Sequence, residues 1–287
     1  MKKDSKQAVP EIPQVHKKLT NRLICGAKCI KYKLTEPILL RIMRSLHQGK
    51  YENIEESPLV SVIIATYNRG RILVERTLPS IFSQSYQNFE VVIVGDHCPD
   101  NTPELLAKMK DPRVRFYNLT KRGKYPASPE LRWFVQGTVP RNKALQLARG
   151  KWFSWISDDD ILLPNHIESL LKFAQKGNYE FVSAAYITKK HGKEFVVDVK
   201  GVEPRIGGMQ TWLYRSYLRF FKWNKDSWRK SWNRPTDYDL QHRMYNAGVR
   251  MGFLDEVVAY VPPVEGTDTV GLEAQKYLAE KERENGS

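Results

Sequence analysis

The sequence contains little cysteine and no long apolar run, and each shortage excludes a class of protein. Three cysteines in 287 residues are too few for a disulfide framework, and an odd number fits a reducing compartment. Cys25 and Cys29 are spaced to share a helix face, but a zinc site needs more such ligands nearby, so we expect no metal there. No apolar run reaches about 18 residues, so no segment is expected to span a membrane. The first residues are also too polar for a secretory signal.

Basic charge is plentiful, but it is unevenly distributed. The formal net charge is +14, and residues 1–50 contain 12 of the 46 Lys and Arg but only 3 of the 32 Asp and Glu. Residues 51–287 are therefore close to charge balance. Because the basic excess lies on an apolar-periodic stretch and not on the main body, we expect no nucleic-acid partner.

The basic residues lie in an N-terminal extension, residues 1–57, that we expect to be helical in part. Residues 1–13 are polar and contain proline, which is typical of disorder. Between residues 15 and 46 apolar residues recur at helical spacing, and Pro37 is expected to divide this stretch into two helices. Basic amphipathic helices either lie on anionic lipid or pack their apolar side on the main domain. The sequence leaves both open.

Beyond the extension, apolar runs alternate with helix-like segments. Four runs are candidate strands, at residues 59–65, 89–94, 114–117 and 152–156. Four helical patterns accompany them, at residues 71–83, 102–109, 142–148 and from Pro164 onward. This alternation predicts an α/β fold with a mostly parallel, doubly wound sheet. In such sheets ligands bind beyond the carboxyl ends of the strands, so the loops after Ala65, Val94 and Ile156 should share one functional edge.

Three consecutive acids, Asp158, Asp159 and Asp160, follow the last of these strands. An Asp before a helix is a favoured N-cap, and Asp160 is the candidate for capping the helix expected from Pro164. Capping does not need three carboxylates that repel one another, however. Carboxylates gathered at one pocket suit a hard divalent cation, Mg²⁺ or Mn²⁺, whose remaining ligands come from substrate phosphates.

Four segments, in the expected order, resemble the motifs of the family 2 glycosyltransferases. They are Val60-Ser-Val-Ile-Ile-Ala-Thr-Tyr-Asn68, Val91-Val-Ile-Val-Gly-Asp-His-Cys-Pro-Asp-Asn-Thr102, the stretch from Arg141-Asn-Lys-Ala through the acidic triplet to Pro164, and Thr236-Asp-Tyr-Asp-Leu-Gln-His-Arg243. The resemblance implies a GT-A fold, a Rossmann-like twisted sheet flanked by helices, over residues 58–265, followed by a helical tail at 266–287. It also implies sugar transfer with inversion from a nucleotide-sugar donor, commonly UDP-linked, assisted by Mn²⁺ or Mg²⁺.

Carried over position by position, the resemblance assigns most candidate residues to the donor. Asp96 would lie against the nucleotide base, Arg141 close to the nucleotide, and Asp158 beside the ribose and diphosphate. Asp159 falls on the position of the family's metal-ligating acid. The nucleotide pocket would further be lined by Thr66, Tyr67, Asn68 and Arg69.

The fourth motif assigns the acceptor side. Asp237 matches the family's catalytic acid and would take the proton from the acceptor hydroxyl, while Asp239 is the competing candidate. Capping of a helix at 240–247 is the structural alternative for both acids, and it suits Asp239 better. His242 would be either a third metal ligand or a core histidine. The aromatic segment 212–232 serves either an acceptor cleft or the core.

Two departures from the family pattern keep other functions open. Ser157 and Gly95 stand where the family commonly has acids, so the metal and the base stay undecided, and a non-catalytic sugar- or nucleotide-binding protein is one alternative. A nucleotidyltransferase is another, although residues 65–70 lack the glycine-rich basic loop of those enzymes. The expected partners are a nucleotide-sugar donor, a glycan or lipid-linked acceptor, and an anionic membrane surface reached from the cytoplasmic side.

Overall fold

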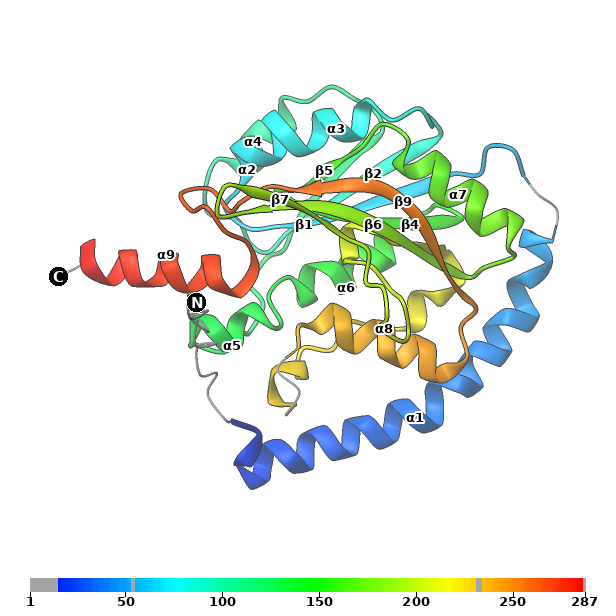
Figure 1. Cartoon of the computed structure of the whole chain (residues 1–287), viewed down its shortest axis with the longest axis horizontal. Helices are drawn as coiled ribbons and strands as arrows, with labels where there is room; N and C mark the ends of the chain where they lie inside the picture. The colour runs from blue at the N-terminus through cyan, green and yellow to red at the C-terminus, as the bar shows by residue number, and fades with distance from the viewer. Residues whose placement is uncertain (1–14, 53–54, 231–233, 286–287) are drawn as a thin grey trace, which may run out of the picture.

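One twisted sheet forms the centre of the molecule, and helices lie on both of its sides (Figure 1). The computed structural model describes residues 15–52, 55–230 and 234–285, so the disorder expected for residues 1–13 lies outside the described residues. The strands are β1 (Val60–Thr66), β2 (Phe89–Gly95), β3 (Val114–Asn118), β4 (Trp152–Ser157), β5 (Ile161–Leu162), β6 (Phe181–Lys190), β7 (Lys193–Val197), β8 (Leu213–Arg215) and β9 (Met251–Val261).

The strand order is β3-β2-β1-β4-β8-β6-β9-β5, with β7 paired to β6. Strands β1 to β4 pair in parallel, as the alternating pattern predicts. The rest of the sheet is mixed: β8 is antiparallel to both β4 and β6, and β5 is antiparallel to β9, whereas β6 and β9 are parallel. The predicted mostly parallel sheet is therefore correct only for the first half. In the second half β6 turns directly into β7, and such a hairpin gives an antiparallel pair without a crossover helix.

The α-helices alternate with the strands of the first half and then flank the second. They are α1 (Leu19–His47), α2 (Gly70–Ile72), α3 (Leu78–Phe82), α4 (Thr102–Ala107), α5 (Pro129–Trp133), α6 (Thr138–Leu147), α7 (His166–Lys176), α8 (Thr236–Ala247) and α9 (Gly271–Asn285). Short helical turns are η1 (Val15–Lys17), η2 (Gln48–Tyr51), the π-helical η3 (Leu73–Thr77), η4 (Met209–Thr211), η5 (Ser216–Phe220) and η6 (Ser227–Arg229). None of the helices in the described ranges is long and apolar enough to cross a membrane.

Two helix predictions are wrong in detail. Pro37 does not divide the N-terminal stretch, because α1 runs through it as one helix. Only the N–H of Pro37 is lost from the helix ladder, and the carbonyl it would have bonded belongs to exposed Lys33, where water can replace the bond. Asp160 does not cap α7, because the short strand β5 lies between them and Asn165 precedes the first helical residue.

Two apolar layers, one on each side of the sheet, hold the fold together. Along β1, Val62 and Ile64 belong to one layer and Ile63 to the other, as the period of two in a strand requires. The second layer also takes up much of the aromatic segment, so the core interpretation is correct for its buried members. These are Trp212, Tyr214, Tyr217, Phe221 and Trp223.

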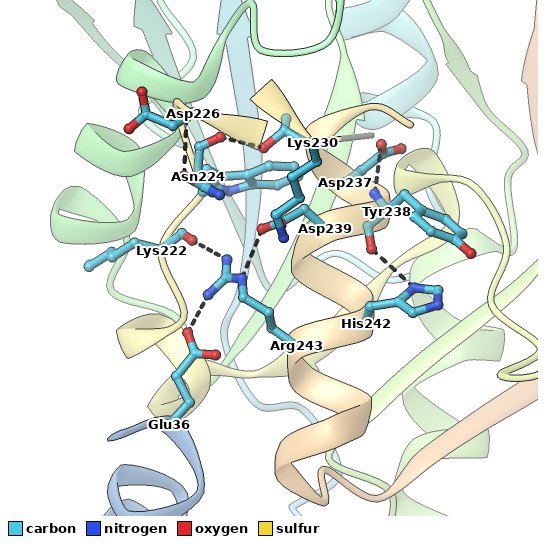
Figure 2. Close-up of polar contacts among 12 residues, drawn as sticks. Glu36, Lys222, Asn224, Asp226, Lys230, Asp237, Tyr238, Asp239, His242 and Arg243 are labelled. Atoms are coloured by element: carbon cyan, nitrogen blue, oxygen red, sulfur yellow. Dashed lines mark hydrogen bonds and ion pairs between the residues drawn. The ribbon is translucent and has the colours of Figure 1, made fainter. Parts of the chain in front are cut away.

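A buried ion-pair cluster joins α1 to α8 (Figure 2). The Arg243 Nε donates to Asp239 Oδ2 at 2.9 Å, and the same guanidinium pairs with Glu36 of α1. Lys230 is a second partner of Asp239, which is fully buried. Burial raises the pKa of Glu36 to about 7, and the charge of Arg243 opposes that rise. The guanidinium therefore balances two carboxylates that could not otherwise be buried side by side.

We expect Arg243→Met to lower the free energy of unfolding by about 3–5 kcal/mol, because it leaves Glu36 without a partner and Asp239 with only Lys230. Urea denaturation at neutral pH measures this. The matched control is Arg71→Met, which removes exposed ion pairs with Glu75 and Glu265 and should cost less than about 1 kcal/mol. Equal losses in the two variants would show that the cluster does not support the fold.

Candidate functional site

Strands β1, β2 and β4 end at one edge of the sheet, and the loops that follow them meet there. Thr66 is paired with Gly95, and Ala65 with Ser157. The backbone N–H of Asp96 donates to the Thr66 carbonyl at 2.9 Å. The prediction that these three loops share an edge is confirmed.

Asp158 is buried at the centre of this edge and is held from the β1 side. Its carboxylate accepts a hydrogen bond from Thr66 Oγ1 at 2.7 Å and another from the backbone of Tyr67. The Arg69 guanidinium lies 3.5 Å away. Burial raises the pKa of Asp158, and the charge of Arg69 opposes that rise. The donors of the loop after β1 therefore offset part of the cost of ionising a buried carboxylate.

The other two acids of the triplet have different surroundings. Asp159 is partly exposed and forms an ion pair with Arg69, which thus bridges Asp158 and Asp159. Asp160 is buried, and burial together with the charge of Asp159 raises its pKa well above the ordinary value. The Thr77 hydroxyl lies 3.0 Å from the carbonyl oxygens of both Asp158 and Asp160, and this contact fixes the backbone of the turn.

The loops after β1, β2 and β3 form a second cluster of polar groups next to the acidic turn. Asp96 is buried, and its carboxylate accepts from the Gly123 N–H at 2.9 Å. Burial and then the charge of Asp96 raise the pKa of the neighbouring Tyr125. The Arg122 guanidinium lies 3.7 Å from the ring centroid of Tyr67, within cation–π range. Aromatic rings and buried polar groups thus converge where the nucleotide was predicted.

Asn68 and Arg69 also line a cavity of about 290 Å³ that extends toward α9. Asn68 adopts a φ of 54°, a left-handed conformation that Asn tolerates better than most residues. Asp100 and Glu265 line the same cavity, whereas Asp96 and Asp158 do not. The cavity therefore lies beside the acidic turn, and the buried carboxylates of the predicted donor site do not line it.

Asp237 on α8 and Arg141 on α6 lie close enough for their charges to interact. Arg141 lies over the Trp223 ring, 4.8 Å from its centroid, and donates to the Gln136 carbonyl at 3.2 Å. Burial lowers the pKa of Arg141, and the charge of Asp237 opposes this change. Burial conversely raises the pKa of Asp237, and Arg141 opposes that rise. These paired effects place the two groups in one electrostatic neighbourhood.

Asp239 and His242 point elsewhere, as Figure 2 shows. Asp239 lies with Arg243 on the side of α8 that faces the ion-pair cluster. The Nδ1 atom of His242 lies 3.2 Å from the Tyr238 carbonyl, and its ring centroid is 4.0 Å from that of Tyr238. His242 therefore packs along α8 against Tyr238.

The chemistry of the acidic turn fits a divalent cation only in a limited sense. Across residues 15–52, 55–230 and 234–285, no three His, Cys, Asp or Glu side chains gather to hold a metal ion. Mg²⁺, however, commonly takes only one or two protein carboxylates and completes its shell with phosphate oxygens and water. Asp159 fits that smaller requirement, because it is the partly exposed acid of the turn. A cation there would share the carboxylate with Arg69.

Sequence reasoning missed several residues of this edge. Tyr186 on β6 lies within electrostatic reach of two acids: burial and then the charges of Asp237 and Asp160 raise its pKa to about 12. No motif marked it, because its strand is distant in sequence from both acids. Arg122 had a signal, since it belongs to the basic run 121–124, but that run was not interpreted.

The comparisons with known proteins agree with this geometry. The family model described as "Glycosyl transferase family 2" matches residues 61–129 and 137–247. Glycosyltransferase GlyG of Streptococcus pneumoniae serotype 4 is 30% identical over 132 residues, 45% of this chain and 40% of that protein. Poly(ribitol-phosphate) beta-N-acetylglucosaminyltransferase TarP of Staphylococcus aureus is 28% identical over 138 residues, 47% of this chain and 38% of that protein. The chain thus spans less than half the length of these curated relatives.

Solved structures support the fold. Staphylococcus aureus TarS 1–349 in complex with UDP-GlcNAc has a TM-score of 0.58 at 20% identity, over 73% of this chain and 60% of that one. The mannosyltransferase PcManGT from Pyrobaculum calidifontis, in complex with GDP-Man and Mn²⁺, has a TM-score of 0.51 at 17% identity, over 81% and 70%. The predicted GT-A fold is confirmed by this likeness. Because the family model matches more than half of its residues, the chain belongs to glycosyl transferase family 2.

Proposed function

We propose that the protein is a glycosyltransferase that moves a sugar from a nucleotide-sugar donor, UDP-linked, to a glycan or lipid-linked acceptor with inversion. The observation that carries the proposal is the buried acidic turn next to the β1 loop, with Asp237 in the same electrostatic neighbourhood. The complexes of TarS with UDP-GlcNAc and of PcManGT with GDP-Man support a nucleoside diphosphate sugar as the donor class.

On this proposal the donor lies over the loops after β1 and β2. Asp96 contacts the base, and Asp158 accepts hydrogen bonds from the ribose, most strongly in its ionised form. Three donors favour that form: the Thr66 hydroxyl, the Tyr67 backbone N–H and the Arg69 guanidinium. The remaining contacts to the nucleotide come from Tyr67, Asn68 and Arg141.

Asp159 is the residue that would hold Mn²⁺ or Mg²⁺, and the Mn²⁺ in the PcManGT complex supports a cation in this fold. When bound, the cation would supply Lewis-acid neutralisation of the diphosphate. Arg69 contributes positive charge at the same place and favours the binding of phosphate oxygens. With a cation bound, two positive groups, the cation and Arg69, would thus balance the three neighbouring carboxylates of the acidic turn.

The reaction is a single displacement at the anomeric carbon. The acceptor oxygen forms a bond to the anomeric carbon. At the same time the bond between the anomeric carbon and the diphosphate oxygen breaks, and its electron pair leaves with the nucleoside diphosphate. The proton of the acceptor hydroxyl passes to the Asp237 carboxylate. Burial raises the pKa of Asp237 and makes the carboxylate a stronger base, while Arg141 keeps it ionised before the acceptor arrives.

We place the enzyme on the cytoplasmic side of an anionic membrane, with the N-terminal extension as the contact. The small, odd number of cysteines and the concentration of basic residues in the extension support this placement. The division into an extension at 1–57, a catalytic unit at 58–265 and a tail at 266–287 is part of the same proposal.

We expect Asp159→Ala to weaken the Mn²⁺-dependent part of UDP binding by more than about tenfold, because it removes the protein ligand of the cation. Titration calorimetry with UDP and with GDP, with and without Mn²⁺, measures the effect. Asp268→Ala is the matched control, since Asp268 is an exposed acid paired with His191 and should leave binding unchanged. If wild type and Asp159→Ala bind both nucleotides equally, with or without Mn²⁺, the metal assignment is wrong.

We expect Asp237→Asn to reduce kcat for sugar transfer by about 10²- to 10⁴-fold while the Kd for the nucleoside diphosphate stays nearly unchanged, because only proton removal is lost. Asp239→Asn should instead lower the free energy of unfolding by about 3 kcal/mol, since it weakens a fully buried ion pair.

Three measurements separate these outcomes. Donor hydrolysis by the wild type with Mn²⁺ distinguishes an enzyme from a non-catalytic binding protein and gives a rate before the acceptor is identified. The same assay on both variants, beside urea denaturation, tests the assignment of roles. Near-normal turnover in Asp237→Asn together with collapse in a folded Asp239→Asn would mean that the catalytic acid is Asp239.

A further inference from the structure

Helix α1 turns polar residues toward the body of the protein. Its buried residues are Asn21, Glu36 and Leu40, only one of which is apolar. Lys28 pairs with Asp226, and Arg44 donates to Glu180 through two hydrogen bonds of 2.7 and 2.6 Å. A surface helix of a globular protein normally does the reverse and buries its apolar side. The alternative that α1 packs its apolar side on the main domain holds for Leu40 and Met43, which join the core, but not for the exposed apolar residues of the helix.

An apolar stripe covers the side of α1 that faces away from the protein, and we call it the outward stripe. Its members recur mostly at intervals of three, four or seven residues, which keeps them on one broad side of a helix. Most of the exposed large apolar residues in the described part of the chain belong to it, and Leu19 at 68% and Leu46 at 67% are the most exposed. The stripe consists of Leu19, Leu23, Ile24, Ile30, Leu34, Ile38, Leu39, Ile42 and Leu46.

The charge around the outward stripe has one sign. The only acid within α1 is Glu36, and it is buried against Arg243. Exposed basic residues lie on and just before the helix: Lys17, Lys18, Arg22, Lys31, Lys33 and Arg41. The exposed surface of α1 is therefore apolar and positive, without an exposed carboxylate.

Two occupants could cover such a surface, and the charge decides between them. A second copy of the chain would bring two sets of basic residues against each other, which is unfavourable. The interface of an anionic bilayer suits both features, because apolar side chains enter the acyl boundary while Lys and Arg contact lipid phosphates.

We propose that the outward stripe docks α1 flat in the interface of an anionic bilayer, with its polar side still bound to the protein. Ion pairs of Lys28, Glu36 and Arg44 attach α1 to three parts of the body at intervals of eight residues. The helix would therefore bring the whole enzyme with it and set its orientation, unlike a tail that is free to swing.

This orientation has a consequence for the acceptor, which rests on the proposed function. Helix α1 lies along α8, on the side of α8 away from the sheet (Figure 1), and the first turn of α8 carries Asp237. A docked α1 would hold Asp237 at a fixed height above the lipid phosphates. Such a site favours an acceptor hydroxyl presented on a lipid-linked carrier over a freely diffusing glycan.

Vesicle flotation tests the docking directly. Full-length protein is mixed with vesicles of phosphatidylglycerol and phosphatidylcholine in equal parts, or of phosphatidylcholine alone. We expect binding only to the anionic vesicles. Leu34→Glu/Ile38→Glu should weaken it by more than about tenfold, because it replaces two members of the outward stripe with acids. Val196→Glu is the matched control, since Val196 is an equally exposed apolar residue on β7 and should bind like the wild type.

A second variant tests the charge and protects the experiment against a folding defect in the first. Lys31→Gln/Lys33→Gln/Arg41→Gln leaves the stripe intact and should weaken binding at low salt by on the order of a hundredfold. Circular dichroism and UDP binding without vesicles verify that each variant is folded.

Three results would overturn the docking proposal. They are unchanged vesicle binding in both variants, equal binding to both kinds of vesicle, and a wild-type dimer in sedimentation velocity that Leu34→Glu/Ile38→Glu dissociates. Donor hydrolysis in solution separates this failure from failure of the proposed function. If the wild type binds vesicles but does not hydrolyse the donor, only the proposed enzymatic function is contradicted, and the docking proposal stands.

Discussion

Burial of neighbouring carboxylates at the end of a parallel strand is the constraint on which the site depends. Ionised groups so close together are costly in a low-dielectric environment unless positive charge and hydrogen-bond donors surround them. The neighbouring strand β1 supplies both, because its register brings Thr66 and Arg69 to the turn after β4. The packing that sets the register of β1 thus also sets the electrostatics of the site. Arg69 alone does not neutralise the carboxylates of the acidic turn, so the turn still favours a further positive charge.

The same constraint separates the two acids at the start of α8. Residues two positions apart on a helix point about 200° apart, so Asp237 and Asp239 cannot both face the site. The ion pair of Asp239 with Arg243 faces α1 and leaves Asp237 on another side of α8, where the charge of Arg141 reaches it. We infer that the ion-pair cluster helps to orient the proposed base through the contact between α1 and α8.

Apolar runs and the polar loops after them, read from the sequence alone, predicted the first half of the sheet. The apolar runs of β1, β2 and β4 and the polar loops after them were identified because burial on both faces leaves a continuous signal. The strands β5 to β9 were not predicted, since their pairing depends on distant segments and on short connections. The same gap explains the errors at Asp160, where β5 intervenes before the helix, and at Pro37, where ion pairs along α1 outweigh a single missing N–H. Tyr186 stayed hidden because only the folded sheet brings β6 to the acids.

The most direct test of the central claim is a crystal structure with UDP and Mn²⁺, with the metal located by its anomalous scattering. We expect one strong manganese peak in contact with a carboxylate oxygen of Asp159 and with oxygens of the diphosphate. We also expect the base beside Asp96 and the leaving-group end of the diphosphate open toward Asp237. A nucleotide bound away from the loops after β1, β2 and β4, or a manganese peak with no contact to Asp159, would contradict the central claim.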